Sequence, residues 1–419
     1  MTTATLNNNT ATALIFAPLA AVRDAVNQID RGLLLLLLGL TVLGVVMVAT
    51  SSIALGESYT GDAHYFLKRH LVNLSLATTA ALVCVFSPIR WWQQSSILLL
   101  LLGALVLLAV LIPGVGVEIK GARRWINLGV MNLQATEVAR ICALIYFADY
   151  LVRRRSNLAN EFRGILIPAI VLAGYGLLIG LQPDLGSTIL LAAACFTLLF
   201  LGGLPIGWVM VMAVMMLAVV VVLIFSADYR AARLLTFLAE NPDIQGSGYQ
   251  AWQSMTAIAR GGWFGVGLGN SLQKFLYLPE VHTDYVFAVF AEEFGLLAVV
   301  SLLGLFAWLL LKGFAVGRAA ALRDAWFSAY LAWGISVAIL LQVVVHVLVN
   351  VGLAPSTGVV LPFMSYGGSA LLATGVMCGL LLRVSVENGA HNNLSAEAKR
   401  RQTRGGTRDT ASNTQEVPA

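Results

Sequence analysis

Long uninterrupted apolar runs constrain the fold of this chain more than any other feature. The segments 32–54, 96–112, 207–225 and 326–349 each approach the roughly 20 residues that an α-helix needs to cross a bilayer. Only 11% of the 419 residues are charged, and the mean hydropathy of +0.82 lies outside the range of soluble domains. Because lipid offers no water to unpaired backbone groups, these runs predict an all-α polytopic membrane protein.

Hydropathy predicts ten transmembrane helices, an even number that places both termini on one side. Their expected spans are 32–54, 70–87, 95–112, 134–151, 164–181, 187–203, 207–226, 284–312, 326–349 and 363–383. The first helix is expected to be an uncleaved anchor, because no small-residue cleavage site follows it. The positive-inside rule places two loops and the C-terminal tail in the cytoplasm, on the strength of Arg153, Arg154, Arg155, Arg163, Lys312, Arg318, Arg323, Lys399, Arg400, Arg401 and Arg404.

The same pattern divides the chain into three regions. A cytoplasmic segment (1–31) precedes the membrane domain (32–383), and a polar tail (384–419) without hydrophobic periodicity is predicted to be disordered. Residues 227–283 form an unusually long extracytoplasmic loop between the seventh and eighth helices. Helical spacing of the apolar side chains around Trp252 and Met255 predicts a helix lying along the membrane surface within this loop.

The cysteines and histidines give no sign of a metal centre or a disulfide. Cys84, Cys142, Cys195 and Cys378 all lie in apolar runs, which indicates packing residues. His282 has no second ligand at metal-binding spacing; it could relay a proton or simply bind backbone in a loop. We therefore assign no metal site.

Basic residues also occur where the orientation rule predicts few, on the outer loops. In GARRW (121–125) they could anchor to lipid headgroups, or their forked donors could bind a pyrophosphate. The glycine-rich segment 261–270 could add backbone N–H groups, although a flexible loop or tight packing explains it more simply. The outer basic residues are Lys120, Arg123, Arg124, Arg230, Arg233, Arg260 and Lys274.

Two polar turns interrupt the apolar pattern near helix ends. QPDLGS (182–187) carries Gln182 and Asp184, and a turn in which Asp184 caps the next helix accounts for it. LPFMSYGGSA (361–370) predicts broken backbone that meets either protein or a water-filled cavity.

The stretch YLPEVHTDYVFAVFAEEFG (277–295) places several ionisable groups at the edge of lipid. If a helix begins near Thr283, Asp284 lies in its first turn on a face of small residues, where the helix dipole favours an ionised carboxylate that can accept a proton. The alternative is that Asp284 or Thr283 merely caps the helix. Glu292 and Glu293 lie deeper, so each is expected to pair or to face a cavity. Glu137 and Arg140 are spaced to form one internal ion pair.

Five motifs in this order resemble the SEDS family (shape, elongation, division and sporulation). They are GARRWINLG (121–129), QPDLGST (182–188), QGSGYQAWQS (245–254), GVGLGNSLQKFLYLPEVHTDYVFAVFAEEFG (265–295) and GLAPSTGVVLPFMSYGGS (352–369). GSGYQ and GNSLQK are typical of the division branch rather than the elongation branch. The chain departs from the family at QATEVAR (134–140), at Ala370 and at Tyr285, and none of these departures removes the acidic residue.

The resemblance implies a peptidoglycan glycosyltransferase that polymerises lipid II on the outer face of the inner membrane at the division septum. It implies that Asp284 is the general base and that undecaprenyl pyrophosphate is the leaving group. Its charge would be stabilised by Arg123 and Arg124 with Lys120 and Lys274, and a divalent cation could share that task. Glu280, His282, Gln182 and Asp184 complete the expected substrate-binding set.

The expected partners are a class B penicillin-binding protein and other division proteins, not nucleic acid. A lipid II flippase would need the same basic rim and an amphipathic groove, and it should also show polar groups through the full depth of the membrane. Glu292 and Glu293 are deep polar groups of this kind, so the flippase stays an alternative. A non-catalytic division scaffold that recruits a transpeptidase is the third alternative.

Overall fold

Ten long helices form the body of the protein in a computed structural model of the chain. It describes residues 27–119, 121–129, 131–155, 158, 162–225, 235, 237, 246, 248–275, 278 and 280–412. Within these residues every predicted transmembrane helix has a counterpart. The long helices are α2 (Arg31–Ser51), α4 (Tyr65–Phe86), α6 (Ser96–Leu111), α7 (Ala135–Arg153), α8 (Phe162–Gly180), α9 (Leu185–Leu201), α10 (Ile206–Phe225), α13 (Val286–Ala321), α14 (Trp326–Asn350) and α15 (Gly368–Ser412).

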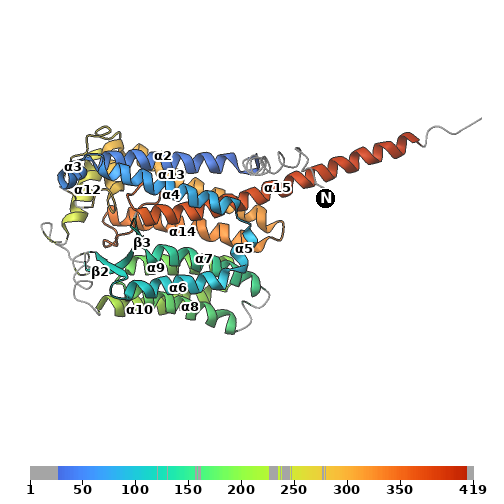
Figure 1. Ribbon diagram of the computed structural model, residues 1–419, viewed down its shortest axis with the longest axis horizontal. Coiled ribbons are helices and arrows are strands. Elements are labelled where there is room, and N and C mark those ends of the chain that lie inside the picture. Colours follow the sequence, from blue (N-terminus) through green and yellow to red (C-terminus); the bar gives the residue numbers. More distant parts are fainter. Residues whose placement is uncertain are drawn as a thin grey trace, which may run out of the picture.

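The bundle is layered around α14 and α15. Figure 1 shows these two helices between a layer of α2, α4 and α13 and the remaining helices, and α14 contacts α7, α9 and α13. Five of the helices in the described part of the chain are long and apolar enough to span a membrane alone, and four more are shorter and apolar. The exception is α7, whose Glu137–Arg140 ion pair is buried inside the bundle, as the spacing predicts. The four cysteines are free and buried.

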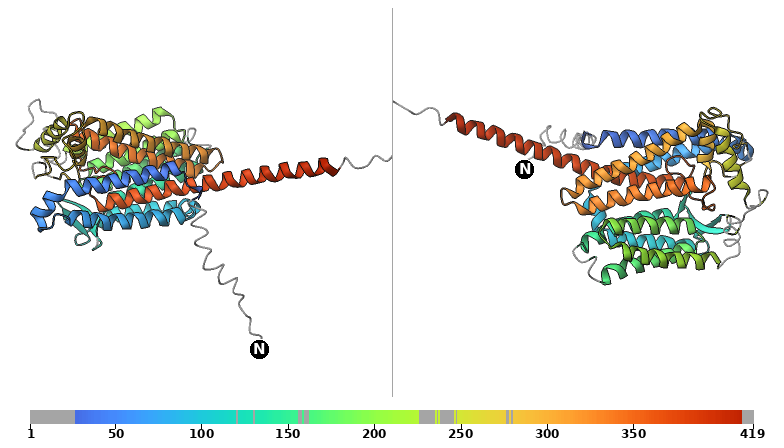
Figure 2. Two further views of the ribbon diagram at one scale, coloured as in Figure 1. Left: turned by 90° about the horizontal axis from the view of Figure 1, so that it is seen from above. Right: turned by 180° about the vertical axis from the view of Figure 1, so that it is seen from behind.

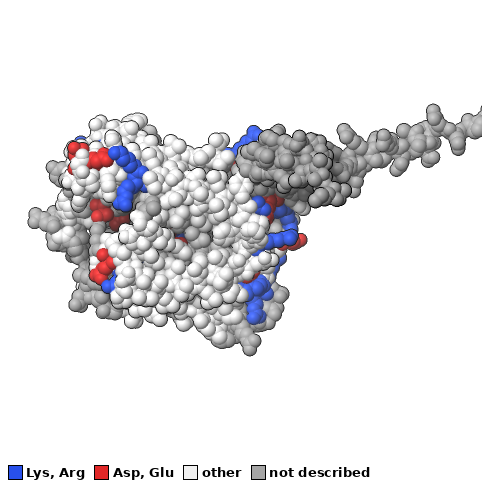
Figure 3. Space-filling view, in the orientation of Figure 1, with Lys and Arg blue, Asp and Glu red and all other residues white. Residues whose placement is uncertain are grey.

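The charged side chains gather at the two ends of the bundle. Figure 3 shows an uncharged belt between them on the face that it draws, as expected for a surface against lipid. We call the end that carries the strands, α3 (Ile53–Thr60) and α12 (Tyr249–Gly261) the site end, and the opposite end, near α5 (Ile89–Gln94), the basic end. Helix α2 begins at the basic end, and α15 leaves the bundle at the same end and continues beyond it (Figure 2).

A small antiparallel sheet at the site end is absent from the sequence prediction. Its strands are β1 (Gly116–Ile119), β2 (Ala122–Asn127) and β3 (Asn132–Gln134), in the order β1-β2-β3. A bulge between Val117 and Glu118 shifts the first pairing, and Trp125 lies opposite Gln134 in the second. The motif GARRW is therefore mainly a strand, and the sheet forms one wall of the site described below.

Two helices differ from their predicted bounds. Helix α13 is interrupted at Gly295, whose φ of 77° and ψ of −177° are not helical. Helix α15 continues to Ser412, so the predicted disorder from Val384 is wrong for residues 384–391. There the Asn388 side chain donates to Val316 O at 2.9 Å and binds Arg323, contacts that a hydropathy pattern does not reveal.

The surface helix predicted in the long loop is found as α12. The helix contacts α13 and α14, and its buried residues are Ser254, Ala257 and Gly261, whereas Trp252 and Met255 on the predicted apolar face are exposed. A Cβ atom at Gly261 would lie 2.0 Å from Ala291 O, so the glycine permits close packing. The lack of a side chain at Gly261 therefore lets α12 pack directly against the backbone of α13.

Helix α2 packs closely against the segment between α14 and α15 at Gly44. A Cβ atom at Gly44 would lie 1.9 Å from Phe363 O, in the segment between α14 and α15. We expect Gly44→Ala to destabilise the protein by about 1–3 kcal/mol, because a backbone carbonyl cannot move away as a side chain can. Gly39→Ala is the matched control: it lies on the same helix with nothing within 4 Å and should stabilise slightly. Thermal unfolding in detergent measures both, and equal midpoints would contradict the close contact.

Candidate active site

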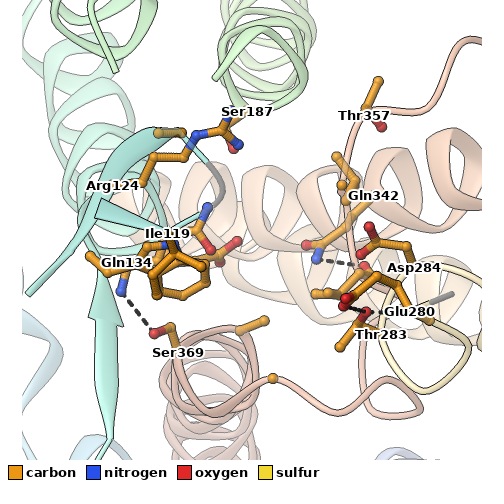
Figure 4. A pocket seen from close by; sticks show the side chains of 18 of the residues that line it. Ile119, Arg124, Gln134, Ser187, Glu280, Thr283, Asp284, Gln342, Thr357 and Ser369 are labelled. Carbon is orange, nitrogen blue, oxygen red and sulfur yellow. Dashed lines mark hydrogen bonds between the residues drawn. The ribbon is translucent and has the colours of Figure 1, made fainter. Parts of the chain in front are cut away.

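A cavity of about 470 Å³ opens at the site end, between the sheet and the start of α13. Figure 4 shows Arg124 and Gln134 on one side of it and Glu280, Thr283 and Asp284 on the other. The residues that line it are Ile119, Ala122, Arg124, Trp125, Gln134, Glu137, Ser187, Leu190, Gln250, Glu280, Thr283, Asp284, Gln342, Ser356, Thr357, Gly358, Val359, Val360, Tyr366, Gly367, Ser369 and Ala370.

Asp284 lies in a tight turn before α13, not inside the helix as the sequence predicts. The backbone N–H groups of Thr283 and Asp284 both donate to Glu280 O, at 3.1 and 3.0 Å. Glu280 has a φ of 56°, a left-handed conformation that ends the preceding loop in this turn. The helix itself begins at Val286. The turn presents the half-buried Asp284 side chain on the cavity wall.

Three hydrogen bonds from neighbouring elements hold this turn in place. The Asn350 amide donates to Asp284 O at 3.0 Å, the Ser365 hydroxyl donates to Thr283 O at 2.7 Å, and the N–H of Tyr366 donates to His282 O at 2.8 Å. The first comes from the end of α14 and the other two from the segment before α15. Sequence reasoning missed Asn350 and Ser365, because neither position carries a local signal of its partner.

The Asn350 side chain also caps the start of α13. Its Oδ1 atom accepts the N–H of Ala288 at 3.1 Å, in the first turn of the helix, so a side chain from another helix caps it. Gly358 lies beside Asp284 and has a φ of 71°; a Cβ atom there would lie 3.9 Å from Asp284 Oδ2. The carboxylate therefore faces a backbone segment that leaves it room.

Arg124 lines the cavity, but its guanidinium is engaged by the turn before α9. Its Nε donates to Gln182 O at 3.0 Å, its Nη2 donates to Pro183 O, and its Nη1 lies 3.7 Å from an Asp184 carboxylate oxygen. Asp184 in turn caps α9 by accepting from Ser187 N at 3.2 Å, which confirms the capping interpretation. Arg124 thus fixes the shape of the wall.

Most of the other predicted binding residues lie away from the cavity wall, and Glu280 is the exception. Arg123 pairs with Glu118 on the neighbouring strand at 3.2 Å. The Gln182 amide donates to Leu107 O at 2.9 Å, and His282 is buried with its ring 4.7 Å from that of Phe66. Lys120, with Arg230 and Arg233, lies outside the described residues.

Glu292 and Glu293 are fully buried and paired, as expected. Glu292 accepts from Arg260 at 2.7 Å, from the Ser271 hydroxyl and from Leu272 N at 3.1 Å, while Lys274 lies 3.2 Å from Glu293. The N–H groups of Val266 and Gly267 add bonds to the carbonyls of the same two glutamates. These contacts clip the glycine-rich loop onto α13. Close packing, rather than a flexible loop, therefore accounts for the glycines.

The charge on the cavity wall is mainly negative. Its acids are Glu280, Asp284 and Glu137, of which Glu137 is paired with the buried Arg140, and its one arginine, Arg124, lies beside Asp184. Such a wall suits hydroxyl groups, which can donate to carboxylates and lose a proton to one of them. Among the described residues no group of three or more His, Cys, Asp or Glu side chains could hold a metal ion, so a metal bound by the protein alone has no observed site in that part.

Comparisons with known proteins agree with this architecture. The sequence profile of the cell cycle protein family of FtsW, RodA and SpoVE matches residues 31–390. A probable peptidoglycan glycosyltransferase FtsW from Alkalilimnicola ehrlichii is 44% identical over 360 residues, covering 86% of this chain and 90% of that protein. A chain of a peptidoglycan synthase complex, described as coordinating polymerization and crosslinking, has a TM-score of 0.69 and 31% identity over 86% of this chain and 98% of its own length. Rod shape determining protein RodA from Thermus thermophilus has a TM-score of 0.63 and 29% identity, with coverages of 85% and 96%.

Proposed function

This chain belongs to the cell cycle protein family of FtsW, RodA and SpoVE, and we propose that it polymerises lipid II into glycan strands with Asp284 as general base. It is a peptidoglycan glycosyltransferase of the FtsW type, as its curated relatives are named. The single observation that carries the mechanism is the Asp284 carboxylate on the wall of a cavity at one end of the membrane bundle.

The reaction joins two sugars by displacement at one carbon. Asp284 takes the proton from the 4-hydroxyl of the acceptor N-acetylglucosamine, and the oxygen forms a bond to the anomeric carbon of the donor N-acetylmuramic acid. The bond from that carbon to the pyrophosphate oxygen breaks, and undecaprenyl pyrophosphate leaves with the electron pair. Attack opposite the leaving group inverts the configuration, as when a carboxylate base acts from the opposite face of the ring.

The described residues around Asp284 support this role by fixing its position. The turn is held by Asn350, Ser365 and the backbone of Tyr366, so little reorganisation is needed when the acceptor binds. Burial raises the pKa of the Tyr366 phenol, so its hydroxyl stays protonated on the cavity wall and can donate to a sugar. A divalent cation that shares in stabilising the leaving group would be held by the phosphate oxygens of the substrate.

The basic end supports an orientation with the site end outside the cell. Arg153 and Arg154 lie where α7 ends, Arg323 lies between α13 and α14, and Lys312 in α13 pairs with Asp30 just before α2; basic segments of this kind are retained in the cytoplasm. The protein would then lie in the inner membrane, at the division septum, with both termini inside. A class B penicillin-binding protein is the proposed partner, in keeping with the related complex that couples polymerization to crosslinking.

The structure gives another role to the residues that favoured a lipid II flippase in the sequence. Glu292 and Glu293 are the deep polar groups that would fit a flippase, but Glu292 pairs with Arg260 of α12 and Glu293 pairs with Lys274 of the loop that follows. A structural scaffold would have no use for a carboxylate held on a cavity wall. The glycosyltransferase therefore explains more of the structure than either alternative.

The test is a polymerisation assay with labelled lipid II. We expect the purified protein, together with its transpeptidase partner, to yield glycan strands that a gel resolves by length. The same preparation in liposomes should leave lipid II in its original leaflet. No polymer in the presence of the partner, combined with flipping in liposomes, would establish the transporter instead.

A further inference from the structure

A second cavity of about 380 Å³ adjoins the first at the site end. Five residues line both: Ile119, Trp125, Thr283, Tyr366 and Gly367. Thr283 precedes Asp284, so the shared wall lies next to the proposed general base. The other residues that line the second cavity are Arg69, Asn73, Asn127, Gly129, Met131, Asn132 and Gly368.

The two cavities differ in charge. The second has one arginine, three asparagines and no acidic side chain among the described residues that line it, whereas the first has Glu280 and Asp284 besides the Glu137 that is paired with Arg140, and its arginine is engaged by the turn before α9. A doubly charged pyrophosphate would be repelled by the carboxylates of the first cavity and attracted by the second. Asparagine amides add N–H donors that phosphate oxygens can accept.

Arg69 makes one hydrogen bond to a side chain among the described residues, whereas Arg124 makes two hydrogen bonds and lies beside a carboxylate. The Nη1 of Arg69 donates to the Tyr65 hydroxyl at 2.8 Å, and its guanidinium lies 5.5 Å from the Tyr65 ring centroid. Both contacts are to a neutral group, and no carboxylate lies within 4 Å of Arg69 in the described part of the chain. Helix α15 begins at Gly368 on the same wall, so the positive end of its dipole adds to the attraction.

We propose that the second cavity binds the pyrophosphate of the lipid-linked donor, with Arg69 as its principal cationic ligand. This inference rests on the proposed function for the source of the pyrophosphate. The anomeric carbon would then lie at the shared wall, with Asp284 and the acceptor on one side and the leaving group on the other. An inverting displacement needs this opposition, because the attacking oxygen and the departing oxygen lie on opposite faces of the carbon.

The experiment measures binding, not turnover. The full-length protein in phosphatidylcholine nanodiscs is titrated with undecaprenyl pyrophosphate. Arg69→Gln should weaken binding about tenfold or more, as expected for the loss of charge-assisted hydrogen bonds. Lys68→Gln is the matched control, because Lys68 is exposed on the same helix, pairs with Asp62 at 2.7 Å and lines neither cavity; its affinity should match the native protein.

A second variant keeps the test decisive if Arg69→Gln folds poorly. The Asn127 side chain accepts the N–H of Gly129 at 2.7 Å in a local turn, a bond that aspartate also makes. Asn127→Asp therefore adds one negative charge to the second cavity without disturbing the strand end, and it should also weaken pyrophosphate binding. Native affinity in both Arg69→Gln and Asn127→Asp would overturn the proposal.

Two further arms of the experiment separate a pyrophosphate site from a general headgroup site and from the proposed function. If phosphatidylglycerol added to the nanodiscs displaces the pyrophosphate, Arg69 belongs to a general site for phospholipid headgroups and the proposal fails. Continued specific binding supports it. A native protein that binds undecaprenyl pyrophosphate but makes no polymer would refute the proposed function alone, whereas a protein that polymerises normally with unchanged Arg69→Gln affinity would refute this inference alone.

Discussion

Asp284→Asn is expected to lower the rate of lipid II polymerisation by about 10²–10⁴-fold, the usual contribution of a general base. The amide has nearly the shape of the carboxylate but cannot take a proton. Its backbone bonds to Asn350 and Glu280 do not involve the side chain and should persist. The measurement is the initial rate of glycan synthesis from labelled lipid II, with the transpeptidase partner at saturating concentration.

The control for this variant is Asp62→Asn, at the same end of the molecule. Asp62 is partly exposed, lines neither cavity, pairs with the exposed Lys68, and accepts the N–H of His64 at 2.9 Å, a bond that asparagine can also make. It should therefore retain the native rate. Undiminished polymer from Asp284→Asn would remove this residue from the mechanism, whereas loss of rate in both variants would indicate a general effect of charge at the site end.

The helices of this fold are predictable because helices buried in lipid need long apolar runs, which hydropathy detects. Hydropathy predicts all ten long helices, including the less apolar α7, whose Glu137–Arg140 pair is also predicted from its spacing. The strands are not predictable in the same way. Strand β2 carries Arg123, Arg124 and Trp125 in succession, which is not the alternation of a half-buried strand.

The candidate site shows where sequence reasoning ends. Asp284 is identifiable from its motif, and its place on a cavity wall agrees with that assignment. The paired arginines suggest a phosphate clamp by chemistry alone. Arg124 instead binds the carbonyls of Gln182 and Pro183, and such a contact, 58 residues away in the chain, depends on the tertiary fold. The sequence around Arg69 does not point to the proposed role. That role follows from the absence of acidic side chains among the described residues that line the second cavity, which only the fold reveals.

The loop between α12 and α13 illustrates how two consecutive glutamates can serve structure. Glu292 is completely buried and satisfied by three donors, so the desolvation of its charge is offset by hydrogen bonds as well as by Arg260. Hydropathy indicates only that such charges must pair or face a cavity. The partner depends on Gly261, which brings α12 against the backbone of Ala291.

Asn350→Asp should test the positioning of Asp284 while keeping the side-chain acceptor that caps α13. The substituted carboxylate can still accept the N–H of Ala288, but position 350 is fully buried, so the cost of desolvating the new charge should lower the unfolding temperature. The donor to Asp284 O is lost, and two oxygens then face each other. We expect kcat to fall about 10–100-fold, since a small displacement of a catalytic group has effects of this size.

One further readout and two further variants distinguish this positioning role from a merely structural one. KM should stay near its native value, because Asn350 lines neither cavity. Asn350→Ala loses the helix cap as well, so it should lower both kcat and the unfolding temperature. Asn388→Asp is the matched control: its amide donates to Val316 O at the basic end, so any destabilisation there should leave the kcat of the folded protein unchanged. If Asn350→Asp lowers stability and leaves kcat intact, the amide caps a helix and has no part in aiming the base.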